Sequence, residues 1–152
     1  MTDNRQTVDP VVEQIRLGFP SVDFQTFDAG VPSLVIPAEH LVAVCRYLKV
    51  TPSLDFDYLA SVTAIDYLDR IDIVYQIRSL TTNQDVVLRL EVDRDESVAP
   101  SVTSVWRAAD FQEREIYDLL GVIFDGHPDL RRILLPDDWE GYPLRKSYTE
   151  ID

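Results

Sequence analysis

Two stretches in the middle of the chain, in which every second residue is large and apolar, restrict the fold more than any other feature. These residues are Ile71, Ile73, Tyr75, Ile77, Val86, Leu88, Leu90 and Val92. A period of two is typical of a strand with one face in a core. Residues 81–85 provide a connection of hairpin length between the two stretches. We therefore expect an antiparallel pair of strands, followed by a charged loop over residues 93–100.

The residues before this pair predict two helices and two short strands. Asp9 followed by Pro10 is typical of a helix start, and Gly18 and Pro20 end the pattern. Its apolar face comprises Val11, Val12, Ile15 and Phe19. Short strands are expected at residues 22–28 and 32–36. A second helix should open at Pro37, and its apolar stripe comprises Leu41, Val44, Cys45 and Leu48.

A third helix is expected after residue 109. Asp110 followed by Glu113 has the spacing of a capping box, with Asp in the place of Ser or Thr. Ile116, Leu119 and Leu120 would form the inner face, and Gly121 would end the helix. Together these elements predict the α+β class, a single domain over residues 1–152 with helices packed on a mixed or antiparallel sheet.

Residues 125–152 combine helix-breaking residues with large apolar ones. The breakers are Gly126, Pro128, Pro136, Gly141 and Pro143, and the apolar residues are Ile133, Leu134, Leu135, Trp139, Tyr142, Leu144 and Tyr148. No long regular element fits this pattern, yet a disordered segment would be poor in such side chains. We therefore divide the domain into a core of residues 1–124 and a long irregular C-terminal segment, residues 125–152, that binds a partner.

The charge and the motif content exclude several classes of function. The formal net charge of −13 opposes nucleic acid and anionic lipid as partners. The sequence contains no run of 18 apolar residues, so no segment is expected to cross a bilayer. One cysteine cannot ligate an iron–sulfur cluster, and His40, His127 and Cys45 lack zinc-ligand spacing. No glycine-rich nucleotide motif is present. The sequence therefore predicts no bound cofactor or metal, and no catalytic residue. The polar N-terminus lacks the apolar stretch of a signal peptide, and a single cysteine, which cannot form an internal disulfide, suits a reducing cytoplasm.

The acidic residues of the third helix allow a different interpretation, a paired-carboxylate enzyme. Glu113, Glu115 and Asp118 lie close together in the sequence. General acid–base catalysis would require two of them in one cleft. However, Arg114 lies four residues before Asp118, which is the spacing of an ordinary ion pair on a helix surface. We therefore favour a helix whose charges face solvent.

Residues 106–148 resemble one known family, the NuoC or thirty-kilodalton (C) subunit of respiratory complex I. The signature is EREIYDLLGV at residues 113–122, followed by FDGHPDLRRIL at 124–134 and PDDWEGYPLRK at 136–146. Its characteristic residues are Glu113, Arg114, Glu115, Asp118, Gly121, Gly126, His127 and Pro128. The match covers a little over a quarter of the chain nearly without gaps.

The resemblance implies a structural subunit in the peripheral arm of NADH:quinone oxidoreductase, on the cytoplasmic side of the cell membrane. It would support electron transfer from NADH to quinone coupled to proton translocation. The resemblance also implies that NADH, FMN, iron–sulfur clusters and quinone bind to partner subunits, and that the chain packs against the D-type subunit that shapes the quinone pocket. The hypothetical partner interface comprises Arg131, Arg132, Trp139, Tyr142, Arg145 and Lys146.

Other assignments stay open at this point. The same subunit type is found in membrane-bound hydrogenases, formate hydrogenlyase and F420- or ferredoxin-linked quinone oxidoreductases. A stand-alone carboxylate enzyme and a plain interaction domain are further alternatives. For Arg131 and Arg132, we predict a larger role in assembly than in folding, because arginine forks suit carboxylates across an interface. The alternative is an intrachain pair with Asp129 or another surface acid, which would contribute little.

Overall fold

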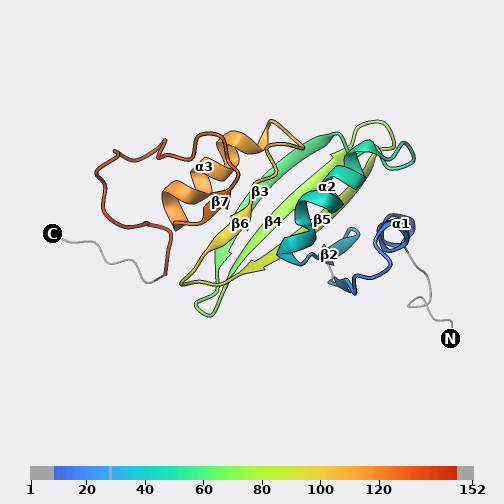
Figure 1. Cartoon of the computed structure of the whole chain (residues 1–152), viewed down its shortest axis with the longest axis horizontal. Coiled ribbons are helices and arrows are strands. Elements are labelled where there is room, and N and C mark those ends of the chain that lie inside the picture. Colours follow the sequence, from blue (N-terminus) through green and yellow to red (C-terminus); the bar gives the residue numbers. More distant parts are fainter. Residues whose placement is uncertain (1–8, 28, 147–152) are drawn as a thin grey trace.

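The computed structural model describes residues 9–27 and 29–146, which form a five-stranded sheet with helices packed on it and a second, two-stranded sheet (Figure 1). The elements are α1 (Pro10–Gly18), β1 (Gln25–Thr26), β2 (Ser33–Val35), the 3-10 helix η2 (Ala38–His40), α2 (Leu41–Val50), β3 (Tyr58–Asp66), β4 (Ile71–Ser79), β5 (Gln84–Val92), β6 (Val98–Pro100), α3 (Ala109–Leu120) and β7 (Ile123–Asp125). This architecture confirms the predicted α+β class. None of the described helices is long and apolar enough to cross a membrane.

The main sheet has five strands in the order β1-β2-β5-β4-β3. β4 pairs antiparallel with both β3 and β5, whereas β2 pairs parallel with β5, so the sheet is mixed. The predicted hairpin is confirmed, since Ser79 pairs with Gln84 across a tight turn. Asn83 in this turn has φ 61°, a left-handed conformation that Asn tolerates better than most residues. β3 forms one edge of the sheet.

The alternating residues of β4 and β5 form the centre of the core. Their apolar side chains are buried in the same cluster as those of α2. In Figure 1, α2 lies over β4 and β5. The predicted stripe of α2 is confirmed, because Leu41, Val44, Cys45 and Leu48 are all buried. Asp9 caps α1 as predicted, accepting hydrogen bonds from the amides of Val11 and Val12 at 2.8 and 3.4 Å.

Two predictions about strands needed correction. The strand expected at residues 22–28 is only Gln25–Thr26, and Asp28 lies outside the described residues. The loop expected at residues 93–100 ends in β6, which pairs parallel with β7 in a second, two-stranded sheet. Strands of three residues are too short to show a period of two, so no local pattern indicates this pairing.

The capping box predicted for α3 is wrong. The helix begins at Ala109, Ala108 occupies the N-cap position, and no side chain caps it. A preceding turn supplies acceptors instead, because the amides of Ala109 and Asp110 donate to the carbonyls of Trp106 and Arg107. Glu113 is therefore free to turn into the protein, where it is fully buried. The predicted stop at Gly121 is confirmed, since it takes φ 77° at the C-cap.

Candidate interaction surface

The described residues after β7 form an irregular segment, residues 126–146, which we call the tail. It runs past α3 and projects from the end of the molecule opposite α1 (Figure 1). The tail contains no helix or strand, as the sequence predicted for its described part. Residues 147–152, which include Tyr148, lie outside the described residues. The tail keeps its shape through polar contacts with the core.

The carboxylate of Asp118 is the first and largest of these contacts. Asp118 lies on α3 and is completely buried. Its Oδ2 accepts hydrogen bonds from three consecutive tail amides, those of residues 133, 134 and 135, at 3.1, 2.6 and 3.0 Å. Its Oδ1 accepts one from Nη1 of Arg132 at 2.9 Å. One side chain therefore fixes the direction of four successive tail residues.

These contacts also set the charge state of Asp118. Burial by itself raises the pKa of this carboxyl, but the tail amides and the Arg132 guanidinium lower it by more, so the net pKa lies below its usual value. Hydrogen bonds to the charged form are a general cause of such a shift. Asp118 is therefore an anion at neutral pH, and its bonds to the tail are the stronger, charge-assisted kind.

Arg132 completes this anchor from the tail side. Its side chain is only 9% exposed. Besides the Asp118 carboxylate, it donates to the carbonyl of Asp118 at 2.7 Å and to the carbonyl of Gly141 at 2.9 Å. Its guanidinium carbon lies 4.8 Å from the ring centroid of Tyr142. Arg132 thus connects α3 to two points of the tail, residue 132 itself and Gly141.

This arrangement corrects the ion pair predicted between Arg114 and Asp118. Asp118 pairs with Arg132, whereas Nε of Arg114 lies 3.5 Å from the carbonyl oxygen of Arg131. The helical spacing of Arg114 and Asp118 was correct, but it does not decide which face of the helix is covered. Arg132 lies fourteen positions after Asp118 in the sequence, so only the folded tail brings them together.

A second anchor holds the end of the tail. Arg145 donates from Nε to the carbonyl of Leu120 at 2.6 Å, from Nη1 to the carbonyl of Arg94 at 2.7 Å and from Nη2 to Oγ of Ser97 at 3.1 Å. Next to it, the amide of Lys146 donates to Oδ2 of Asp66 at 2.8 Å. The tail is therefore fixed to the core at both of its ends.

Asp66, at the end of β3, links this second anchor to the sheet. Arg94 donates to both of its carboxylate oxygens, at 2.7 and 3.0 Å. These hydrogen bonds from Arg94 hold the pKa of Asp66 well below its usual range, and the amides of Lys146 and Leu68 add to the effect. Asp66 is therefore a second buried anion that organises the tail.

Tyr142 packs directly on the end of α3, which explains why residue 121 is Gly. A Cβ on Gly121 would lie 2.7 Å from the Tyr142 ring, and the positive φ of this residue would strain any other side chain. The rings of Tyr117 and Tyr142 are 6.2 Å apart. Tyr142 therefore contributes to the fold of the tail as well as to its surface.

His127 and Glu113, two further signature residues, have structural partners. Nδ1 of His127 accepts from the amide of Asp129 at 2.9 Å, and its Nε2 lies 3.0 Å from both the carbonyl and Oδ1 of Asp110. Since Nδ1 accepts, Nε2 carries the proton and donates to Asp110. The imidazole is fully buried and thus ties the start of the tail to the start of α3.

Glu113 accepts a hydrogen bond from the hydroxyl of Ser101 at 2.7 Å and one from the amide of Val102 at 2.8 Å. Burial raises the pKa of this carboxyl, although these hydrogen bonds oppose the shift. Glu113 thus faces the turn at residues 101–103, Asp118 faces the tail, and Glu115 is exposed to solvent. The three carboxylates point to different surroundings, which does not suit a paired-carboxylate active site.

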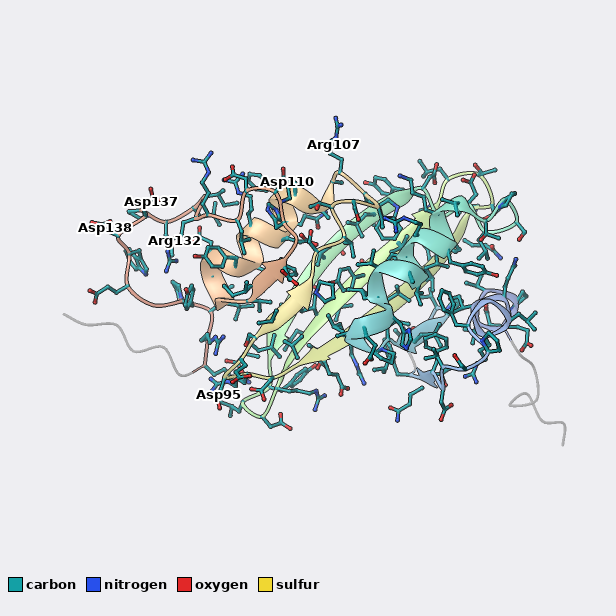
Figure 2. The ribbon with its side chains drawn as sticks, in the orientation of Figure 1. Asp95, Arg107, Asp110, Arg132, Asp137 and Asp138 are labelled. Carbon is teal, nitrogen blue, oxygen red and sulfur yellow. The ribbon has the colours of Figure 1, made fainter. Side chains whose placement is uncertain are left out.

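Between its two anchors, the tail exposes large apolar side chains. Leu134 is 54% exposed, Trp139 39% and Leu144 59%. The acidic residues Asp137 and Asp138 are also exposed, and Figure 2 shows both at the outer side of the tail, away from the sheet. A short segment that is fixed at both ends and exposes several large apolar residues has the character of an interaction surface.

The structure separates the six residues of the hypothetical partner interface. Trp139 is exposed, and Arg131 is 67% exposed and pairs with Asp129 at 3.1 Å, the alternative considered from the sequence. Arg132 and Arg145 are bound within the chain, Tyr142 packs on Gly121, and Lys146 contributes its backbone amide to Asp66. A larger role in assembly than in folding therefore does not suit Arg132. Whether any of the six contacts a partner stays a prediction.

Sequence analysis did not identify two residues that matter here, Asp66 and Arg94. Neither residue belongs to a pattern that distinguishes it from a surface charge. Their role follows only from contacts with the end of the tail, since Asp66 accepts from the amide of Lys146 and the carbonyl of Arg94 accepts from Arg145. Leu144, by contrast, was named among the apolar residues of the segment but not in the hypothetical interface. It could have been included there, because it is a large apolar residue between Pro143 and Arg145 with no helical or strand neighbours to cover it.

Comparisons with known proteins agree with the signature. Residues 34–151 match the sequence profile of the family described as respiratory-chain NADH dehydrogenase, 30 Kd subunit. The C subunit of the NADH-quinone oxidoreductase of Salinispora tropica is 43% identical over 148 residues, which cover 92% of this chain and 60% of the relative. The same subunit of Moorella thermoacetica is 41% identical over 143 residues, which cover 93% of this chain and 95% of the relative.

Two solved structures share the fold. Nqo5, in its trypsin-resistant fragment, superimposes with a TM-score of 0.64 at 30% identity, covering 79% of this chain and 96% of the fragment. A chain of the membrane-bound sulfane sulfur reductase, an archaeal respiratory membrane complex, gives a TM-score of 0.73 at 23% identity, covering 91% of this chain and 84% of that chain. At that identity, the second likeness concerns the fold alone.

Proposed function

The chain belongs to the family of 30-kDa subunits of the respiratory-chain NADH dehydrogenase, and from this premise we propose that it is a structural subunit of NADH:quinone oxidoreductase. Within the peripheral arm it would hold neighbouring subunits in place, so that electrons pass from NADH to quinone and protons are translocated. The proposal rests on family membership together with one observation, the anchored tail that exposes Leu134, Trp139 and Leu144.

We further propose that the chain binds no redox cofactor itself. An iron–sulfur cluster generally needs four thiolate ligands, and the sequence contains a single cysteine, Cys45. This thiol is buried in the core. NADH, FMN, iron–sulfur clusters and quinone would then bind to the other subunits. This chain would act by holding those subunits, and therefore their cofactors, at fixed distances from one another.

The partner of the tail would be the D-type subunit that shapes the quinone pocket, on the cytoplasmic side of the membrane. The proposal is supported by the different roles of buried and exposed side chains around the tail. Buried charges at Asp118 and Asp66 determine its path, whereas large apolar side chains between them are left exposed. Exposed anchors of this size, such as Trp139, commonly become the energetic centre of an interface.

A second candidate function is that of an equivalent subunit in a related but different complex. The fold is also that of a chain in the membrane-bound sulfane sulfur reductase. An equivalent subunit of a related hydrogenase, formate hydrogenlyase or F420- or ferredoxin-linked oxidoreductase would be expected to have the same anchored tail. The identity of the electron-donor subunit decides between these machines.

The test is affinity purification of the tagged chain from the native membrane, followed by identification of the proteins that accompany it. The proposed function predicts a D-type subunit and a flavoprotein with an NADH site. A nickel-bearing large subunit in place of the flavoprotein would favour the second candidate. Purification of the chain without any respiratory subunit would contradict both.

A further inference from the structure

A groove lies between β3 and α3, next to the end of the tail. Its volume is about 210 Å³, and it is lined by Val62, Thr63, Ala64, Glu115, Ile116, Leu119, Leu120 and Leu144. Most of these residues are apolar. An apolar cavity of about 150 Å³ is large enough for a benzene molecule, so this groove can accept one large apolar side chain.

The floor of the groove is the outer edge of the main sheet, because β3 is the last strand in the sheet order. The amide of Val62 points away from β4, since it donates to Oε1 of Gln112 at 2.6 Å. Backbone amides alternate in direction along an antiparallel strand. Ala64 is two residues after Val62, so its amide also points away from β4. Within the described part of the chain, no acceptor is seen for this amide. An edge of this kind can pair with another extended chain.

The rim of the groove carries a negative charge. Glu115 is exposed on α3, and no cationic side chain of the described residues lies within ion-pair distance of it. The second rim residue is Leu144, which is 59% exposed and belongs to the tail. The amide of Leu144 donates to the carbonyl of Leu119 at 2.9 Å, so the tail forms one wall of the groove.

From these features we propose that the groove binds an extended segment of a neighbouring subunit. The segment would add to the β3 edge through the backbone of Ala64, place one large apolar side chain between Val62 and Leu119, and carry a Lys or Arg opposite Glu115. Backbone pairing at an open edge, with a pocket for alternate side chains, is an established mode of peptide recognition. The inference rests on the proposed function, because it requires a neighbouring subunit.

The first test places a photo-reactive phenylalanine at Thr63, in the groove, in cells that assemble the complex. A matched variant carries it at Thr82, in the exposed turn between β4 and β5. After irradiation of the purified complex, cross-linked peptides are identified by mass spectrometry. A cross-link from position 63 to a segment of another subunit, absent from position 82, supports the proposal. A cross-link to residues 147–152 of this chain, or none from position 63, overturns it.

The second test reverses the rim charge. Glu115→Lys should lower the yield of intact complex by about tenfold, since like charges across an interface are strongly unfavourable. Glu39→Lys makes the same charge change at another exposed position and should leave the yield unchanged. Equal yields of the two variants would overturn the role of Glu115. Absence of complex even with the unmodified chain would instead contradict the proposed function.

Discussion

Replacement of Arg132 by Ala is the substitution whose effect the structure defines best. The change removes the cation from Asp118, which is completely buried, and also removes the donors to two backbone carbonyls. Breaking a buried ion pair by removing one partner costs about 3–5 kcal/mol. Three tail amides still bind the stranded carboxylate, so we expect a value near the lower end, about 3 kcal/mol. For a domain of this size, that corresponds to a fall of roughly 6–12 °C in Tm.

Arg131→Ala is the matched control for this measurement. Arg131 is the adjacent arginine, and its pair with Asp129 is largely exposed. An exposed pair contributes about 0–1 kcal/mol, so its loss should barely change the free energy of unfolding. Urea unfolding of the isolated chain and of both variants measures the difference. Equal stability of the two variants would refute the view that Arg132 is part of the folded tail.

The effect of Arg132→Ala should also depend on pH. The pKa of Asp118 in the folded chain lies below its ordinary value of about 3.9, so its contribution to stability is present at neutral pH. That contribution is lost as the pH falls below about 4 toward the folded pKa, because the unfolded chain then binds the proton first. The variant should therefore approach the unmodified chain in stability as the solution is acidified, and a constant difference would contradict the assignment.

Three further predictions concern the tail and the cofactors. Gly121→Ala should destabilise the chain by about 1–3 kcal/mol in urea unfolding, because residue 121 has a positive φ and a Cβ would meet Tyr142; an unchanged midpoint would contradict the contact. Trp139→Ala should change the free energy of unfolding by less than about 1 kcal/mol and should reduce the yield of complex. Tyr58→Ala, at an exposed aromatic residue on β3, is the control and should change neither quantity. Equal yields of the two variants would show that Trp139 does not contact a partner. The purified chain should be colourless and contain no stoichiometric flavin, iron or zinc by absorption and elemental analysis, since it has one cysteine; a bound cofactor would contradict a purely structural subunit.

The central parts of the fold could be predicted because they repeat a pattern locally. Every second residue of β4 and β5 is apolar, and the stripe of α2 recurs at the helical period, so each element is recognisable without its neighbours. β6 and β7 were missed because each has three residues, and their pairing joins segments more than twenty residues apart. Short elements of this kind depend on tertiary contacts.

The anchors of the tail were harder to predict than its existence. Glu113 and Asp118 look like ordinary surface charges of a helix, and their burial depends on Ser101 and Arg132, which are distant in the sequence. A carboxylate is rarely fully buried without such partners, so its burial cannot be predicted until those partners are known. By contrast, the combination of Gly, Pro and large apolar residues in the tail was sufficient to predict an irregular segment with an exposed apolar surface.

Hydrogen exchange of the tail, compared between the isolated chain and the purified complex, tests the central proposal most directly. The amides of residues 133–135 are bound to Asp118 and should be protected in both states. Those of residues 137–142 lie between the two anchors, and they should exchange rapidly in the isolated chain and markedly more slowly in the complex. Equal, rapid exchange of residues 137–142 in both states would contradict a tail that binds a neighbouring subunit.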